Sequence, residues 1–499
     1  MKTNSLDFDA QALREKILDL AMRGKLVPQD PNDEPASVLL DKIKAEKAEL
    51  IKEKKIKKTK SLPPITDDEK PFDIPDSWEW VRLGDVGTIT SGGTPKTSEK
   101  SYWEEGKIPW ITPAVMSASQ NDIVFNNKDV KYINNLGLEK SSAHLIQKDS
   151  LVVSSRAPIG YVNIVPFEYT TNQGCKSVSL YDDTNKQFIY FAIKNAVPEM
   201  NRRASGTTFK EISGTKFGQT IVPLPPLSEQ SRIAAKIAQL FALLRKVESS
   251  TQQYAKLQTL LKSKVLDLAM RGKLVKQDPN DEPASVLLEK IKVEKAELVR
   301  EKKIKKSKPL PPITDEKKPF DIPDSWEWVR LGNIVSYQNG YAYKSSELVK
   351  IRKGLPVIKS QNIMTLKVII KDNNDYVKEP NEKMLNSKII KGDLLMCLSS
   401  QSKNPEPLGK TAIYDLDKPA LLNQRVLKLK LINHSMTDLI YYFINSSWFH
   451  FTVSHRGSGS GQSNLKLGDV MNMPIPVPPL NEEKHIVNRI EILFKKLSN

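Results

Sequence analysis

The feature that most constrains this chain is an internal repeat. Residues 16–84 recur at 264–332 without a gap, at a constant offset of 248, and 59 of the 69 paired positions are identical. The copies diverge after Gly84 and Gly332, and weaker matches return at 223–227 with 476–480. The repeat predicts a constant frame around two unlike domains of about 155 residues each.

A long helix is predicted between the two domains. From 228 to 271, apolar residues recur in alternating steps of four and three, with Thr251 and Gln258 as polar breaks, which is typical of a coiled-coil seam. Pro225-Pro226 precede this pattern and Gly272 follows it. The seam comprises Ile233, Ile237, Leu240, Leu244, Val247, Tyr254, Leu261, Val265 and Leu268.

The chain ends carry matching half-seams. Ile486, Ile490 and Leu493 match the start of the central seam at an offset of 253, and Leu13, Ile17 and Leu20 match its end at 248. The two terminal helices are therefore predicted to complete a long antiparallel two-helix coiled-coil spacer. The resulting α+β (mixed α/β) fold has a globular domain at each end, pseudo-two-fold symmetry and a circularly closed course.

Each frame copy also contains a lysine-rich helix, predicted over 36–59 and 284–307, with Asp33 or Ser37 as the cap of the first. Strands are predicted within 149–156 and 392–400, and helices within 186–196 and 436–447. The predicted boundaries are a terminal half-helix (1–27), a lysine-rich helix with a proline-rich connector (28–71), a first domain (72–226), the central helix (227–275), a second lysine-rich helix and connector (276–319), a second domain (320–479) and a C-terminal half-helix (480–499).

The charge balance indicates a polyanionic partner. The chain carries 76 Lys and Arg against 59 Asp and Glu, a net charge of +17, which favours nucleic acid. Ten of these charges lie in 41–60 and 289–308. Glu and Lys alternate there at helical spacing, so the alternatives of a solvated helix, a phosphate contact and a protein contact remain open.

Several classes of protein are disfavoured. Two cysteines and five scattered histidines support neither a disulfide framework nor a zinc site. The N-terminal residues contain no apolar stretch, which favours a cytoplasmic protein. LGKT (408–411) and RGSGSG (456–461) each lack glycines that a phosphate-binding loop requires. Asp76, Glu105 and Lys107 imitate a Mg²⁺-dependent nuclease, but the second copy lacks an equivalent of the last two.

An ordered set of motifs resembles a known family. The first domain contains WEWVRLG (78–84), TSGGTP (90–95), YWEEGKIPWITP (102–113), TNQG (171–174) and GTTFKEI (206–212). The second contains NGYAYKSS (339–346), GDLLMCLS (392–399), LNQRVL (422–427) and PVPPLNEE (476–483). These motifs, over nearly the whole chain, resemble the specificity subunits of Type I restriction-modification enzymes.

The resemblance implies a function. Each domain would read one half of a split DNA sequence, and two modification subunits would bind the spacer and methylate adenine with S-adenosylmethionine. Restriction subunits would translocate and cut DNA with ATP and Mg²⁺. The chain itself would hold no cofactor and no metal and would catalyse nothing.

Candidate base-reading residues are the polar and basic groups of the variable loops. In the first domain they are Ser91, Thr94, Lys96, Tyr102, Thr112, Arg156 and Lys210. In the second they are Tyr341, Tyr343, Lys344, Lys359, Gln361, Asn362, Gln401, Lys403, Arg456 and Gln462. Asn172-Gln173 and Asn423-Gln424 occur in both domains, so a shared structural role is predicted for them.

Three hypotheses follow. The first is a Type I specificity subunit that binds double-stranded DNA together with modification and restriction subunits. The second is a stand-alone, two-headed DNA-binding scaffold. The third, less favoured, is a Mg²⁺-dependent nuclease that uses Asp76, Glu105 and Lys107.

Overall fold

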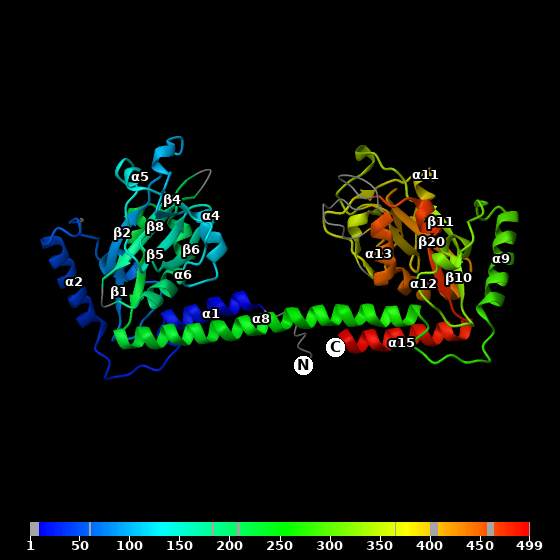
Figure 1. Ribbon diagram of the computed structural model, residues 1–499, viewed down its shortest axis with the longest axis horizontal. Helices are drawn as coiled ribbons and strands as arrows, with labels where there is room; N and C mark the ends of the chain where they lie inside the picture. The colour runs from blue at the N-terminus through cyan, green and yellow to red at the C-terminus, as the bar shows by residue number, and fades with distance from the viewer. Residues whose placement is uncertain are drawn as a thin grey trace. The chain divides into compact units, whose positions relative to one another are not determined.

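The computed structural model describes residues 9–58, 61–181, 184–206, 210–364, 366–399, 408–456 and 464–498. The chain divides into two compact units, Met1–Thr251 (unit 1) and Gln252–Asn499 (unit 2). Each unit combines helices with several small sheets (Figure 1), as the predicted mixed α/β class requires. Among the described residues, no helix is both long enough and apolar enough to cross a membrane.

Unit 1 is built on a four-stranded antiparallel sheet with the order β2-β8-β5-β6. A second sheet, β4-β3-β7, contains the parallel pair β3–β7, and β1 pairs with β9. The strands are β1 (Glu79–Arg82), β2 (Gly87–Ser91), β3 (Ile108–Ile111), β4 (Lys131–Ile133), β5 (Ser150–Ser155), β6 (Ile159–Val165), β7 (Thr170–Thr171), β8 (Cys175–Leu180) and β9 (Ile221–Leu224).

One long helix, α6, covers the four-stranded sheet of unit 1. Its apolar residues, among them Phe188, Phe191 and Ile193, lie in the same buried cluster as Leu151 and Val178 of the sheet. This burial confirms the predicted strand at 149–156 and the predicted helix at 186–196. The helices are α1 (Ala10–Met22), α2 (Ala36–Lys52), α3 (Leu83–Val86), α4 (Pro113–Met116), α5 (Asn135–Glu139), α6 (Lys186–Arg203), α7 (Gly214–Gly218) and the first part of α8 (Leu227–Met270).

Unit 2 repeats this plan with different strand lengths. Its main sheet has the order β11-β20-β17-β18, the second is β15-β12-β19-β16 with β12–β19 parallel, and β10 pairs with β21. The strands are β10 (Glu327–Arg330), β11 (Val335–Asn339), β12 (Leu355–Ile358), β13 (Ile363–Met364), β14 (Lys367–Val368), β15 (Tyr376–Val377), β16 (Lys388–Ile389), β17 (Leu394–Cys397), β18 (Thr411–Ile413), β19 (Ala420–Leu422), β20 (Val426–Leu431) and β21 (Pro474–Val477). The helices are α9 (Ala284–Arg300), α10 (Leu331–Ile334), α11 (Glu382–Leu385), α12 (Thr437–Ile444), α13 (Ser447–Arg456), α14 (Leu467–Met471) and α15 (Leu480–Ser498).

The bounds of α8 agree with the predicted central helix. In unit 1, Ile233 and Ile237 of α8 are fully buried in a cluster that also contacts Ile17 of α1. A bidentate pair between Arg14 and Glu248, with 2.9 Å from Nη1 to Oε1, joins the same two helices.

In unit 2, the other part of α8 packs on α15. Ile486 and Ile490 are fully buried, and Val265 packs against their cluster. Gln258 donates to the carbonyl oxygen of Leu497. Three predicted seam residues of α8 are more exposed than a seam requires, because Val247 is 44%, Tyr254 48% and Leu261 49% exposed.

The lysine-rich helices end earlier than predicted, at Lys52 and Arg300 instead of residues 59 and 307. The backbone turns at Lys54, whose φ of 59° is left-handed, and at Lys302 with a φ of 58°. The predicted cap is also wrong. Pro35 precedes the first helical residue and supplies no side-chain cap, while Asp33 pairs with Arg232 at 2.6 Å.

The shared tryptophans tie each unit together. Trp78 Nε1 donates to Glu229 at 2.8 Å, and Trp326 Nε1 donates to Glu482 at 2.8 Å. Burial raises the pKa of both carboxyls, and the indole hydrogen bonds oppose this shift. The start of α8 is thereby fixed to the turn before β1, and the start of α15 to the turn before β10.

Candidate nucleic-acid interface

The ends of two parallel strands, β3 and β7, meet at one turn in unit 1. Because β3 and β7 are parallel, their last residues, Ile111 and Thr171, lie together at one edge of the sheet. Asn172 N donates to Ile111 O at 3.0 Å, and Asn172 Oδ1 accepts from Gly174 N at 3.0 Å. Asn172 thus shapes the turn, which is the structural role predicted for it.

Gly174 lets a guanidinium approach this turn. A Cβ atom there would lie 3.0 Å from Nε of Arg156 and 3.2 Å from Cγ of Pro113. Arg156 directly follows β5, and Thr112, which caps α4, precedes Pro113. The turn therefore gathers Thr112 and Arg156, two of the predicted residues.

The same region has an excess of basic groups. Lys176 is 5% exposed, and its Nζ donates to Gln173 O at 2.8 Å and to Ser155 Oγ at 3.1 Å. Glu211 lies 3.4 Å from Lys176 and 3.8 Å from Arg156, so one carboxylate faces two cations. Lys210, which is exposed, adds a third cation beside Glu211. Such a site attracts phosphate or the acceptor edge of guanine.

Gln173 differs from its neighbour Asn172. Its side chain is exposed, and its Oε1 accepts a hydrogen bond from Thr94 Oγ1. Ser91, which is exposed, stands opposite Lys176 in the β2–β8 register. Ser91 and Thr94 therefore also belong to this cluster.

Lys96 and Tyr102 lie on a separate arm of unit 1. Trp103 Nε1 donates to Lys96 O at 3.3 Å, and the Trp103 ring packs edge-on against Trp110 at 5.2 Å. Tyr102 is half-buried, and its carbonyl oxygen accepts from Asn134 N at 3.1 Å. The structure thus divides the seven predicted residues of the first domain between the turn and this arm.

Unit 2 contains an equivalent turn. Asn423 N donates to Ile358 O at 3.0 Å, and Asn423 Oδ1 accepts from Arg425 N at 3.3 Å. Gln424 has an exposed side chain, and its backbone N donates to Tyr341 O at 2.9 Å. The backbone therefore forms the same frame in both units, and a glutamine side chain is exposed from each.

The guanidinium at this turn comes from a different position in unit 2. The bridge between Ser399 and Asn464 corresponds to that between Arg156 and Glu211, so Ser399 occupies the place of Arg156. Arg425 occupies the place of Gly174, and its buried Nη1 has no hydrogen-bond partner among the described residues. Each unit thus has one small residue and one arginine at this pair of positions. In unit 1 the arginine is Arg156 and the small residue is Gly174, whereas in unit 2 the arginine is Arg425 and the small residue is Ser399.

The structure supports some of the remaining candidates of unit 2 as surface residues and contradicts one of them. Tyr341 and Tyr343 pack edge-on at 4.9 Å, Tyr343 Oη lies 3.1 Å from Ser387 Oγ, and Lys344 and Gln361 are exposed. Asn362 is fully buried, and its Nδ2 donates to Ile369 O at 2.9 Å and to Asn374 Oδ1 at 2.8 Å. Its amide therefore stabilises the fold, and the prediction that it reads a base is wrong.

Lys359 is neutralised within the unit. Its Nζ contacts Asp375, which also pairs with Lys350 at 2.8 Å. Burial acts to raise the pKa of Asp375, but the hydrogen bonds from both lysines outweigh it, so the pKa is lowered. Gln401, Lys403 and Gln462 lie outside the described residues, and Arg456 ends α13 with a side chain that is not described.

Four polar residues of these turns were absent from the predicted sets, namely Lys176, Gln173, Gln424 and Arg425. Because the glutamines occur in both domains, the sequence predicted a structural role for them, although the structure leaves both side chains exposed. Lys176 lies in a strand whose alternation does not distinguish an inward lysine from a solvated one.

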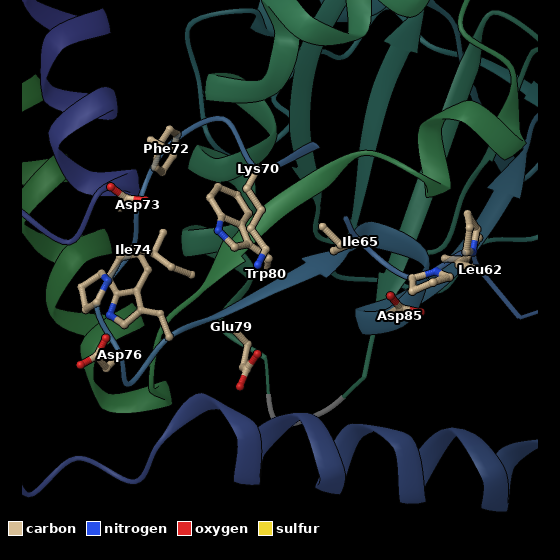
Figure 2. A pocket seen from close by; sticks show the side chains of 14 residues that line it. Leu62, Ile65, Lys70, Phe72, Asp73, Ile74, Asp76, Glu79, Trp80 and Asp85 are labelled. Atoms are coloured by element: carbon tan, nitrogen blue, oxygen red, sulfur yellow. The ribbon is translucent and has the colours of Figure 1, made fainter. Parts of the chain in front are cut away.

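The nuclease alternative has little support in the geometry. Asp76 lines a hollow of about 590 Å³ along the proline-rich connector, together with Asp73, Glu79, Trp80 and Asp85 (Figure 2). Glu105 and Lys107 precede β3 and do not line it. Among the described residues, no group of three His, Cys, Asp or Glu is placed to hold a metal ion.

The fold, with equivalent polar turns at Asn172 and Asn423, is that of a DNA-reading class of protein. The family model for the Type I restriction modification DNA specificity domain matches residues 75–258 and 323–499. The chain belongs to this family.

Two curated relatives extend the match over nearly the whole chain. The EcoAI specificity subunit of Escherichia coli is 33% identical, with 98% of this chain and 89% of the relative covered. The EcoEI specificity subunit of the same organism is 30% identical over the same shares. A solved chain from work on complex assembly and conformational transition of the type I R-M system covers 86% of this chain and 93% of its own length, with a TM-score of 0.55 and 19% identity. That likeness concerns the fold alone.

Proposed function

We propose that the chain is the specificity subunit of a Type I restriction-modification complex and that each unit reads one half of a bipartite DNA target. The observation that carries this proposal is the turn at Asn172 and Asn423, which has one backbone frame in two units with unlike surroundings. A common frame positions both readers alike, while different side chains give them different sequences.

The proposed base-reading set combines the predicted residues with those found at the turns. In unit 1 it comprises Ser91, Thr94, Thr112, Arg156, Gln173 and Lys210, with Lys96 and Tyr102 on the arm. In unit 2 it comprises Tyr341, Tyr343, Lys344, Gln361, Gln424 and Arg425, to which Gln401, Lys403, Arg456 and Gln462 are added from the sequence. Lys176 and Lys359 position their neighbours through internal hydrogen bonds.

Catalysis belongs to partner chains in this proposal. Two modification subunits carry S-adenosylmethionine and methylate adenine, and restriction subunits use ATP and Mg²⁺ to translocate and cut double-stranded DNA. This chain binds no cofactor, and it acts in the cytoplasm, where the DNA is.

The proposed spacer joins the recognition domains, 72–226 and 320–479. The central helix (227–275) pairs with the half-helices at 1–27 and 480–499 as an antiparallel coiled coil, which closes the chain into a pseudo-two-fold ring. The packing of Ile233 and Ile237 in unit 1, and of Ile486 and Ile490 in unit 2, supports this arrangement. Leu20, Leu240, Leu244, Leu268 and Leu493 are half-buried, while Leu13 is 41% exposed.

Replacing residues 333–475 with the second recognition domain of another family member tests the bipartite reading. Because each unit reads its own half-site, we expect the replacement to change only one half of the methylated motif in a host genome. Methylation mapping gives both halves in one measurement. A change in both halves would contradict independent reading.

Two further measurements separate the alternatives. A stand-alone scaffold would not co-purify with two methyltransferase chains, whereas a specificity subunit would. A nuclease would require Mg²⁺-dependent cleavage by the isolated chain that Glu105→Ala abolishes.

A further inference from the structure

Two short basic segments, here called the basic turns, follow the lysine-rich helices. The first is 52–58 (KEKKIKK) and the second is 300–306 (REKKIKK), each with five cations and one glutamate. Every residue of both turns is exposed except Ile56 and Ile304, which are half-buried. They lie outside the recognition loops and have no role in the proposed reading of bases.

The backbone of each turn is fixed in an unusual form. Lys54 N donates to Ile51 O at 3.1 Å and Lys55 N donates to Leu50 O at 2.9 Å, and Lys302 and Lys303 repeat this pattern at 3.1 and 2.9 Å. This helix ending normally places glycine at the left-handed position. Lys54 and Lys302 occupy it with φ values of 59° and 58°. A side chain at this position is unfavourable for the fold alone, which favours a function for the lysine.

Apolar and polar contacts hold each turn on its unit. Ile56 and Ile304 pack against the hydrophobic cores of units 1 and 2. Lys47 Nζ donates to Gly84 O at 2.9 Å, and Lys295 Nζ donates to Val335 O at 3.1 Å, so each helix is joined to its domain. Figure 1 shows α2 along one flank of unit 1, with its end directed away from α8. The lysines are thus presented from a fixed scaffold and not from a loose tail.

Most of these lysines are not neutralised. Lys55 pairs with Glu53 at 2.8 Å and Lys303 with Glu301 at 2.9 Å. Within the part of the chain that the structure describes, no ion pair involves the other lysines, which are Lys52, Lys54, Lys57, Lys58, Lys302, Lys305 and Lys306. Each turn therefore presents three uncompensated cations within five residues.

We propose that the basic turns bind the phosphates of duplex DNA that flanks the bases read by the two units. Long exposed lysines contact phosphates as point charges without selecting a sequence. An acidic protein surface would attract these lysines as phosphates do, but a stable protein interface also buries apolar area. The one apolar side chain of each turn, Ile56 or Ile304, instead packs into its own core. This inference rests on the proposed DNA-binding function and adds a second DNA-binding surface outside the reading loops.

A four-lysine variant of the full chain, assembled with its modification subunits, tests this surface. The turn variant combines Lys57→Gln, Lys58→Gln, Lys305→Gln and Lys306→Gln. The control combines Lys42→Gln, Lys44→Gln, Lys290→Gln and Lys292→Gln. It removes the same charge from the helices that precede the turns, at lysines already paired with carboxylates at 2.8–3.1 Å.

Two DNA probes locate the bound phosphates. Both carry the motif found by methylation mapping, one with 20-base-pair flanks and one trimmed to the motif. On the long probe, we expect the slope of log affinity against log salt to become shallower by about 0.9 for each phosphate that the turn variant no longer neutralises. The control should keep the wild-type slope, and on the trimmed probe the turn variant should match wild type.

An unchanged slope on the long probe would overturn the proposal. Loss of the modification subunits from the turn variant, with the slope unchanged, would identify a protein partner instead and would also overturn it. An altered methylated motif would assign the turns to base reading. Failure of the two-domain reading would appear separately, in the domain replacement.

A second variant pair gives effects of opposite sign. Lys54→Gly and Lys302→Gly relieve the left-handed backbone, so the midpoint of thermal unfolding should rise. Affinity for the long probe should nevertheless fall. A gain in both quantities would show that the lysines do not bind DNA.

Discussion

Gln230 of unit 1 and Glu483 of unit 2 occupy equivalent helix starts but differ chemically. Gln230 Nε2 donates to Pro225 O at 2.9 Å, and its Oε1 accepts from Asn185 N at 3.0 Å. Glu483 is 2% exposed, and its Oε2 has no hydrogen-bond partner among the described residues. Burial, with a smaller contribution from Asp438, raises the pKa of Glu483 to about 7. A protonated Glu483 resembles Gln230 because it carries a donor.

Stability should therefore depend on pH through Glu483. Its pKa is raised in the folded state, so the folded chain binds the extra proton and stability falls as pH rises from the unfolded value, near 4.5, through about 7. We expect Glu483→Gln to stabilise unit 2 at pH 8 by about 2 kcal/mol and to remove this dependence. Urea unfolding between pH 5 and 8.5 measures it. The reciprocal Gln230→Glu should introduce the same dependence in unit 1, and an unchanged pH profile in both variants would contradict this account.

Asn172 and Gln173 should separate folding from binding. Asn172 shapes the turn through its bond to Gly174, whereas Gln173 is exposed. We expect Asn172→Ala to lower the free energy of unfolding by about 1 kcal/mol. Gln173→Ala should leave it unchanged and weaken binding to the methylated motif by about 1–3 kcal/mol if the amide meets a base. Thermal unfolding and DNA titration on the same samples compare the two. Equal loss of stability in both variants would assign Gln173 to the frame.

The sequence predicts which types of residue lie in the reading loops, but it does not predict which of their side chains face solvent. Gln361 and Asn362 were predicted together, yet one is exposed and the other is buried in a network with Asn374. Neighbouring residues in a loop share composition and spacing, so only tertiary contacts distinguish them. For the same reason, the sequence did not show that the arginine of the turn is Arg156 in unit 1 but Arg425 in unit 2.

The best-predicted elements were helices whose ends are marked by proline or glycine in the sequence. The central helix was expected over 228–271 and is observed at Leu227–Met270, because prolines precede it and glycine follows it. The lysine-rich helices were predicted seven residues too long, since lysine and glutamate favour a helix up to the left-handed turn. Pairings such as β1 with β9 join residues more than 130 positions apart, and no local pattern encodes them.

Two isoleucines of α15 offer a matched test of the packing. Ile486 is fully buried against the core of unit 2, whereas Ile492 of the same helix is 40% exposed. Ile486→Ala should destabilise unit 2 by about 2–5 kcal/mol, through reduced burial and the cavity left behind. Ile492→Ala should cost well under half of that value. Urea unfolding of the full chain compares them, and equal effects would show that the buried face has been misassigned.

At the scale of the whole chain, the repeat explains why two units have one plan. The sheets β2-β8-β5-β6 and β11-β20-β17-β18 share an order, although the loops between their strands have little sequence in common. The frame could be predicted because its two copies are nearly identical. The reading surface could not, because each loop takes its shape from its own contacts.

The proposed spacer makes a prediction about the DNA itself. If the spacer sets the unread gap between half-sites, inserting four residues beside Thr251 of α8 should lengthen the helix by about 6 Å and rotate it by about 40°. At 3.4 Å per base pair, this corresponds to a gap longer by roughly two base pairs. The rotation should reduce methylation, because the two units then meet the duplex at a changed angle.

The surviving methylation should show unchanged half-sites with a longer gap. The α1 and α15 segments are not lengthened, so we expect the mismatch to be absorbed where their ends meet in the proposed ring and not within α8. The matched control is an insertion of seven residues at the same place, which lengthens the helix by about 10 Å but turns it by only about 20° from its original phase. It should retain more methylation than the four-residue insertion while extending the gap by about three base pairs. Half-sites that change while the gap stays constant would show that α8 does not set the spacing.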